Sequence, residues 1–252
     1  QSNDRWFINF YHGKGELGIF AIGAKLALIS SLLTTTFAKT WWPFALDALN
    51  NNLNNKIIFR KVGRLYFGIS IISVIFLTAF STFLVDKFLH PTYFNSWPII
   101  GILSWQTVFF GFSNYIACLG IFKVEKTKIF LPLMAFTLLN GIFLNWILVP
   151  KYSGIGAAIA TSLTFFLWAL LVLIVGNIYW PIGFERKSLV INLVIGISST
   201  TSLILFNNFL NLFSKLFIAF FISLIIFIFT VRDEEKKQIY KIIKNSYYKY
   251  FT

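Results

Sequence analysis

The stretch LVPKYSGIGAAIAT, residues 148–161, decides how this chain folds. One apolar run ends at Pro150, four residues follow, and the next run opens on glycine and alanine. Proline does not extend a helix, and "KYSG" is typical of a turn. We therefore expect a short turn between two helices, the second starting at Gly154. Its small residues at four-residue spacing, Gly154, Ala158 and Ser162, predict close helix packing.

The composition of the chain is that of a membrane protein. Of its 252 residues, 57% are hydrophobic and 12% charged, and the mean hydropathy is +0.74. A single soluble core would bury only a minority of this apolar surface, whereas a bilayer covers it. The one cysteine, Cys118, allows no internal disulfide and no metal-ligand spacing, so a small buried filler is its favoured role.

Seven apolar runs are long enough to cross about 30 Å of hydrocarbon as helices. Strands are excluded because each run is about twice the length of a barrel strand, and lipid offers no partner to an unpaired backbone. The sequence predicts an all-α, polytopic membrane helix bundle over residues 1–231, followed by a cytoplasmic basic tail over 232–252. The runs lie near 17–42, 65–85, 97–122, 129–149, 154–177, 189–206 and 212–231.

Lysine and arginine between the runs predict the orientation. The connections after the first, third, fifth and seventh runs hold fifteen of them, and the opposite side holds five. The positive-inside rule therefore places the N-terminus of the chain outside and its C-terminus in the cytoplasm. The net charge of +13 follows from this topology, so it needs no nucleic-acid partner.

Two basic residues, Lys25 and Lys39, lie within the first run. An ammonium group in hydrocarbon costs at least about 3 kcal/mol, so both should face protein or water. Fourteen residues separate them, which puts them on one helix face about 21 Å apart, together with Gly18, Leu32 and Thr36. Lys39 stands near Trp41 and Trp42, and snorkelling to the interface is its favoured alternative. For Lys25, deeper in the run, a place in a cavity is favoured.

The third and fourth runs carry further polar residues. Ser104, Thr107, Gly111, Asn114 and Cys118 share one helix face, which favours close packing, with Asn114 as a cavity candidate. Asn140 and Asn145 differ by about 140° of helix rotation, so they cannot both face one pore. We expect at least one of them to make a hydrogen bond between helices, and Asn140 stays a cavity candidate.

Two stretches resemble a known transporter family. "NWILVPKYSGIGAAIATSL", preceded by "GIFKVEKTKIF", is similar to polysaccharide flippases of the Wzx type, in the superfamily that also holds lipid II flippases and MATE exporters. "DRWFINFYHGKGELGIFAIGAKLALI", followed by "WWPF", resembles the start of that family's C-terminal half. The resemblance covers most of the chain and is weak after about residue 180.

The resemblance implies the C-terminal lobe of a fourteen-helix transporter of the bacterial inner membrane. Such flippases move an undecaprenyl-pyrophosphate-linked oligosaccharide, such as an O-antigen repeat unit for lipopolysaccharide, by alternating access. Basic cavity residues would receive the anionic head group, and Lys25 occupies the span where one is expected. Polysaccharide polymerase or assembly proteins are further candidate partners.

Other function classes are less well supported by the residues. His12 and His90 have no nearby arrangement that suggests a metal site or a nucleophile, and no phosphate-binding loop is present, so we expect no enzyme and no cofactor. A MATE-like antiporter should have buried carboxylates, yet the candidates, Asp47 and Asp86, sit at span ends. A scaffold that transports nothing is the third alternative.

The tail "VRDEEKKQIYKIIKNSYYKYF", residues 231–251, allows two interpretations. It is either a solvated charged end or an amphipathic helix on the membrane surface, because Ile239, Ile242, Ile243 and Tyr247 share one side. The second interpretation makes anionic membrane lipids a partner of the tail.

Overall fold

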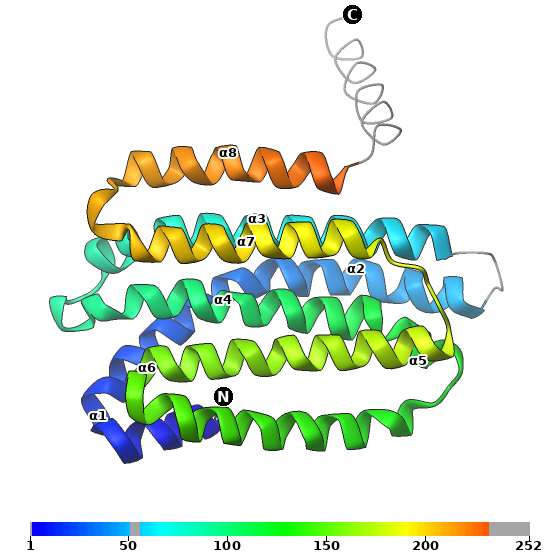
Figure 1. The fold of residues 1–252 in the computed structure, drawn as a ribbon, viewed down its shortest axis with the longest axis horizontal. Helices are drawn as coiled ribbons and strands as arrows, with labels where there is room; N and C mark the ends of the chain where they lie inside the picture. Colours follow the sequence, from blue (N-terminus) through cyan, green and yellow to red (C-terminus); the bar gives the residue numbers. More distant parts are fainter. Residues whose placement is uncertain (1, 51–55, 232–252) are drawn as a thin grey trace, which may run out of the picture.

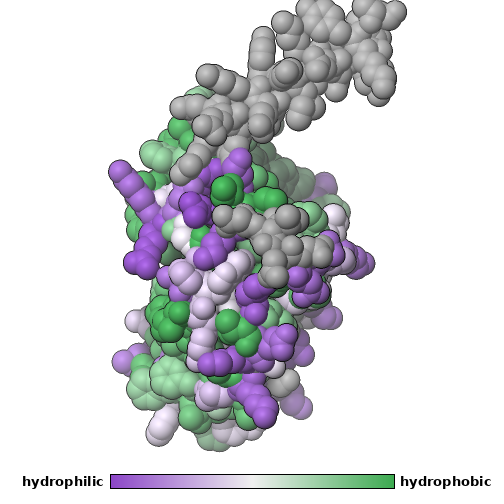
Figure 2. All heavy atoms as spheres, turned by 90° about the vertical axis from the view of Figure 1, so that its right-hand side faces the viewer, coloured by the Kyte–Doolittle hydropathy of each residue, from purple (hydrophilic) through white to green (hydrophobic). Residues whose placement is uncertain are grey.

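The computed structural model describes residues 2–50 and 56–231, and over these ranges the chain is helical and contains no strand. Figure 1 shows the long helices side by side along the long axis of the molecule. The reversals at Gly13 and Ser153 lie at one end, which we call the hairpin end. Arg60, Arg64 and Arg186 lie at the other, the basic end. Figure 2 looks directly at the basic end, where hydrophilic side chains gather between hydrophobic ones.

The protein is a membrane-embedded helix bundle. Within the described residues, six helical stretches are long and apolar enough to cross a bilayer. Large apolar side chains stay exposed on them, such as Phe213 at 86% and Phe217 at 64%. Only lipid or another apolar surface can cover so much exposed hydrocarbon. The stretches are Asn3–Asn50, Lys56–Phe88, Pro91–Lys123, Thr127–Tyr179, Arg186–Leu205 and Leu212–Thr230.

The first stretch folds back on itself, which differs from the sequence-based expectation. Helix α1 (Ser2–Ala27) is broken at Gly13, whose φ of 80° and ψ of −174° are not helical. Its first arm, residues 2–12, runs back along the second, so that Asp4 lines one pocket with Ala24 and Ala27. The predicted first span began near residue 17, and the structure adds this helical arm before it. The 3-10 turn η1 (Leu28–Ser30) joins α1 to α2 (Ser31–Asn50).

Helices α3 (Lys56–Phe88) and α4 (Trp97–Phe112) form the centre of the bundle, joined by η2 (Pro91–Ser96). After α4 comes one turn of π-helix, η3 (Ser113–Ala117), and then α5 (Leu119–Lys123). In this turn the Cys118 N–H donates to the Ser113 carbonyl over 3.0 Å, one residue further back than in an α-helix. The Trp41 indole N–H donates to the Tyr115 carbonyl over 2.8 Å.

Helix α6 (Phe130–Tyr179) follows η4 (Thr127–Ile129) and is a helical hairpin of two arms. The break is at Ser153, with φ 50° and ψ −131°. The arms run side by side in Figure 1, and a Cβ at Gly141 would lie 3.2 Å from the Thr164 side chain. Two of the predicted spans, 129–149 and 154–177, are therefore the two arms of α6. The turn is tighter than expected, because the helix continues through Pro150.

The small residues after Ser153 pack closely, as the sequence predicts. A Cβ added at Gly154 would lie 3.1 Å from Ile99 Cδ1 in α4. Ala157 and Ala158 are fully buried, and the Ser162 hydroxyl donates to the Ile102 carbonyl over 2.7 Å. The second arm of α6 thus lies against α4 along its first half.

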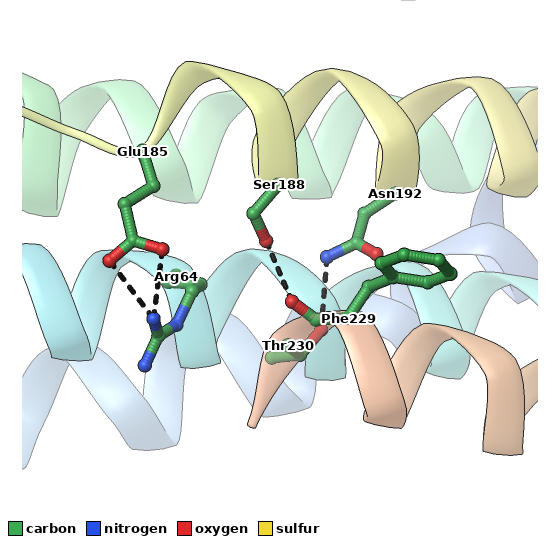
Figure 3. Close-up of polar contacts among 6 residues, drawn as sticks. All are labelled: Arg64, Glu185, Ser188, Asn192, Phe229 and Thr230. Carbon is green, nitrogen blue, oxygen red and sulfur yellow. Dashed lines mark hydrogen bonds and ion pairs between the residues drawn. The ribbon is translucent and has the colours of Figure 1, made fainter. Parts of the chain in front are cut away.

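Helices α7 (Arg186–Leu205) and α8 (Leu212–Thr230), joined through η5 (Asn207–Phe209), form the last hairpin. The Asn192 amide donates to the Thr230 hydroxyl over 2.9 Å, and Figure 3 shows this contact. Lys215 is buried in α8, where its ammonium donates to Thr82 and Asn207. Both helices pack on α3. The predicted tail helix lies outside the described residues.

Candidate functional site

The two predicted lysines lie on one exposed stripe of α1 and α2. Lys25 and Lys39 are both exposed, and Leu32, Thr35 and Thr36 between them are exposed too. Among the described residues, neither ammonium group has a hydrogen bond or an ion pair. Polar and charged side chains within a membrane-spanning helix normally face protein or water. We call Lys25, Leu32, Thr35, Thr36 and Lys39 the lysine stripe.

The two lysines occupy different levels of the bundle. A Cβ at Gly23 would lie 2.9 Å from Ile99, in the first turn of α4, so Lys25 lies close to the hairpin end. Lys39 lies about 21 Å further along, at the 1.5 Å rise of a helix, and stands next to Trp41 and Trp42. The stripe therefore extends over much of the thickness of a bilayer.

Within the described residues, the predicted asparagines make no hydrogen bond with the two lysines. Asn114 is half-buried, and its amide donates to the Phe110 carbonyl of its own helix over 3.0 Å. Asn140 is half-buried on the first arm of α6. Within the described ranges, no hydrogen bond links Lys25, Lys39, Asn114 and Asn140 to one another. The roles of the two asparagines stay predictions.

A second polar site, which sequence reasoning missed, lies between α1 and α6. Asp4 is 5% exposed and Asn145 is 2% exposed, and the Asn145 amide donates to Asp4 Oδ1 over 3.0 Å. The same amide donates to the Gly141 carbonyl over 2.9 Å. This confirms that one of the two asparagines of the fourth run bonds between helices. It also corrects the expectation that no carboxylate is buried within the helices of this chain.

Oxygen atoms without partners lie at the same level. Asn145 Oδ1 and Thr161 Oγ1 are both buried and have no hydrogen-bond partner among the described residues. Gly141 faces Thr164 across the hairpin, so Asn145 and Thr161, on opposite arms of α6, lie at similar levels of the bundle. Buried polar atoms are normally bonded, so the unsatisfied Asn145 oxygen, on a side chain bonded to the Asp4 carboxylate, is suited to a cation or a water molecule. We call Asp4 and Asn145 the Asp4 cluster.

A small pocket lies beside Asp4, between the two arms of α1 and α4. Asp4, Arg5, Leu28, Gln106 and Thr107 are among its lining residues, and its volume is about 20 Å³. That volume holds about one water molecule. Leu28 lies three residues from Lys25, at the spacing that puts both on one helix face. The pocket therefore lies next to η1, and no residue of the lysine stripe lines it.

The Asp4 cluster had a weak signal in the sequence. "DRWFINFYHG", residues 4–13, is an apolar helical segment with a glycine at its end, but Lys14 and Glu16 separate it from the first long run. A window for spans of about 20 residues excludes such a short arm. The His12 ring nitrogen and the Val149 carbonyl, 2.8 Å apart, now fix it to α6.

A scan against protein-family models, a search of curated proteins and a search of solved structures each gave no match. The flippase resemblance therefore rests on the residues quoted above, and the site is interpreted from its geometry.

Proposed function

We propose that the chain is one lobe of a transporter that flips an undecaprenyl-pyrophosphate-linked oligosaccharide across the bacterial inner membrane. The observation that carries this proposal is the lysine stripe, because exposed ammonium groups on a membrane-spanning helix need water or an anion. A second lobe facing the stripe would enclose a wet cavity. The pyrophosphate of the carrier lipid would then meet Lys25, and the oligosaccharide would meet the hydroxyl groups of Thr35 and Thr36.

The experiment is performed in the complete transporter, with surface glycan as the readout. Lys25→Ala should abolish surface glycan at unchanged protein level, and Lys25→Arg should retain part of it because the charge remains. Lys14→Ala is the matched control, since Lys14 is exposed at the hairpin end but outside the stripe. Normal export by Lys25→Ala at normal expression would show that Lys25 does not bind the head group.

The Asp4 cluster favours coupling of this transport to a cation, which the antiporter alternative also requires. A buried carboxylate beside the unsatisfied Asn145 oxygen binds a proton or a small metal ion more readily than an apolar interior does. Cation binding would bring α1 and the two arms of α6 together. Asp4→Asn keeps the size of the side chain and removes its charge.

This second proposal has its own readout. In vesicles with an imposed sodium or proton gradient, Asp4→Asn should abolish the gradient dependence of transport while uncoupled binding of the substrate persists. Asn9→Asp, on the exposed side of the same arm, is the control. Transport by Asp4→Asn that responds to the gradient as the unsubstituted protein does would contradict coupling through Asp4. Because the readouts differ, the two proposals fail separately.

A further inference from the structure

An apolar groove runs between the second arm of α6 and α7. Two cavities form it, with volumes of about 390 Å³ toward the basic end and about 410 Å³ toward the hairpin end. Phe109 and Phe166, whose ring centroids lie 5.2 Å apart, line both cavities, so the two are adjacent along the groove. Trp105 and Phe112 of α4 also line it, one in each cavity. We call this feature the α6–α7 groove.

The groove lies away from the lysine stripe and the Asp4 pocket. A helix turns by about 100° per residue, so Trp105, Phe109 and Phe112 share one face of α4. Leu103 and Thr107, which line the Asp4 pocket, point to the opposite face. A ligand of the groove would therefore be separate from the substrate proposed above, and the inference does not rest on that proposal.

The two ends of the groove differ in charge. At the basic end, Arg186 and Asn177 line it, together with the backbone at Gly183. At the hairpin end its polar residues are the neutral Thr200, Thr201 and Ser162. Arg186 is exposed and has no ion pair or hydrogen bond among residues 2–50 and 56–231. The groove is thus apolar along its length and has the positively charged Arg186 side chain at its basic end.

The neighbouring carboxylate is directed elsewhere. In Figure 3 the Glu185 side chain points to Arg64 of α3, whose Nη1 lies 3.0 Å from each carboxylate oxygen. The Arg60 guanidinium donates to the Ile182 carbonyl over 3.2 Å. These two contacts hold the segment before α7 on α3. They fix the position of the groove mouth and leave Arg186 facing it.

We propose that the α6–α7 groove binds an anionic phospholipid of the bilayer, with an acyl chain along the groove and the phosphate on Arg186. Apolar groove surface on a membrane protein must be covered, and an acyl chain matches the Phe109 and Phe166 lining. A guanidinium binds phosphate through paired hydrogen bonds. Basic pockets between helices at the cytoplasmic side are sites for anionic head groups. The Asn177 amide can donate to the glycerol ester region.

Native mass spectrometry of the purified chain tests this with two probes, phosphatidylglycerol and phosphatidylethanolamine. We expect the unsubstituted protein to retain phosphatidylglycerol in preference. Arg186→Gln should weaken its retention about five-fold, the effect of one basic residue near anionic lipid. Lys187→Gln removes the same charge one residue further along and outside the groove, so retention should stay unchanged.

A third variant tests the apolar part of the site. Val190 lines the groove and is 56% exposed, so Val190→Trp fills the groove from its rim without disturbing the core. It should lower retention of both lipids. Equal retention of the two lipids by the unsubstituted protein, or unchanged phosphatidylglycerol in a folded Arg186→Gln protein, would overturn the proposal. Folding of each variant is checked by its helical circular dichroism.

Discussion

Removing either partner of the Arg64–Glu185 ion pair should destabilise the bundle, and the loss should be larger when Glu185 is removed than when Arg64 is removed. The Arg64 side chain is 3% exposed and that of Glu185 is 24% exposed, and their charged atoms lie 3.0 Å apart. In Glu185→Gln, the buried guanidinium loses the Glu185 carboxylate. In Arg64→Met, the carboxylate that is left can turn toward water, because its segment lies at the basic end.

The sizes follow from burial. Breaking a buried ion pair by removing one partner costs about 3–5 kcal/mol, and we expect Glu185→Gln to fall in that range. Arg64→Met should cost less, about 1–3 kcal/mol, which is the range for a partly solvated polar group that loses its partner. The double variant has no buried charge left at this place. It should therefore be more stable than Glu185→Gln alone, with a coupling energy of at least about 1.5 kcal/mol.

The assay is reversible unfolding of the purified protein in mixed micelles with increasing sodium dodecyl sulfate, followed by circular dichroism. Lys187→Gln, an exposed charge change in the same segment, is the control and should change the free energy of unfolding by less than about 0.5 kcal/mol. If Glu185→Gln costs under about 1 kcal/mol, or if the two single effects simply add, Arg64 is not held by this pair and the reasoning is wrong.

Three further predictions test the packing and the topology. Gly176→Ala places a Cβ 2.5 Å from a backbone oxygen of η3 and should cost about 1–3 kcal/mol in the same unfolding assay, whereas Gly15→Ala, with no atom within 4 Å of its Cβ, should be nearly neutral. Ser153→Gly should be more stable than Ser153→Ala by about 1 kcal/mol, since both lose the hydroxyl but only glycine accepts the φ of 50° without strain. Single cysteines at Tyr152 and Glu125, in a background without the native cysteine, should react with impermeant reagents from opposite sides of the membrane; reaction from one side would contradict the helix arrangement.

The helices and their close packing could be predicted because composition and spacing act locally. Uninterrupted apolar runs set the spans, and the small residues from Gly154 onward set how closely α6 approaches α4. Lysines within a span were recognisable because charge is rare there. Helix geometry predicted a common face for Lys25 and Lys39, and both are exposed although the 3-10 turn η1 lies between them.

The Asp4 cluster could not be predicted, because it depends on contacts between distant segments. Asp4 meets Asn145 only after α1 reverses at Gly13 and its first arm packs against the first arm of α6. The α6–α7 groove is likewise a property of how α7 is held on α3, which the apolar pattern of α7 does not encode. Pro150 was expected to end its helix, yet only three residues remain before the reversal, so the helix loses little backbone bonding there.

The π-helical turn at Ser113–Ala117 has a consequence for how a single span can serve two neighbours. One extra residue in the turn offsets everything after it by roughly 100° around the helix axis. Before the turn, Gly111 receives the Tyr66 and Thr34 side chains, whereas after it Gly120 is turned to the backbone of Gly176. The α4–α5 span therefore presents its two close-packing glycines, Gly111 and Gly120, in different directions around the helix axis. Deleting one residue from the turn would leave both helical segments intact, but it would rotate Gly120 away from the Gly176 backbone of α6.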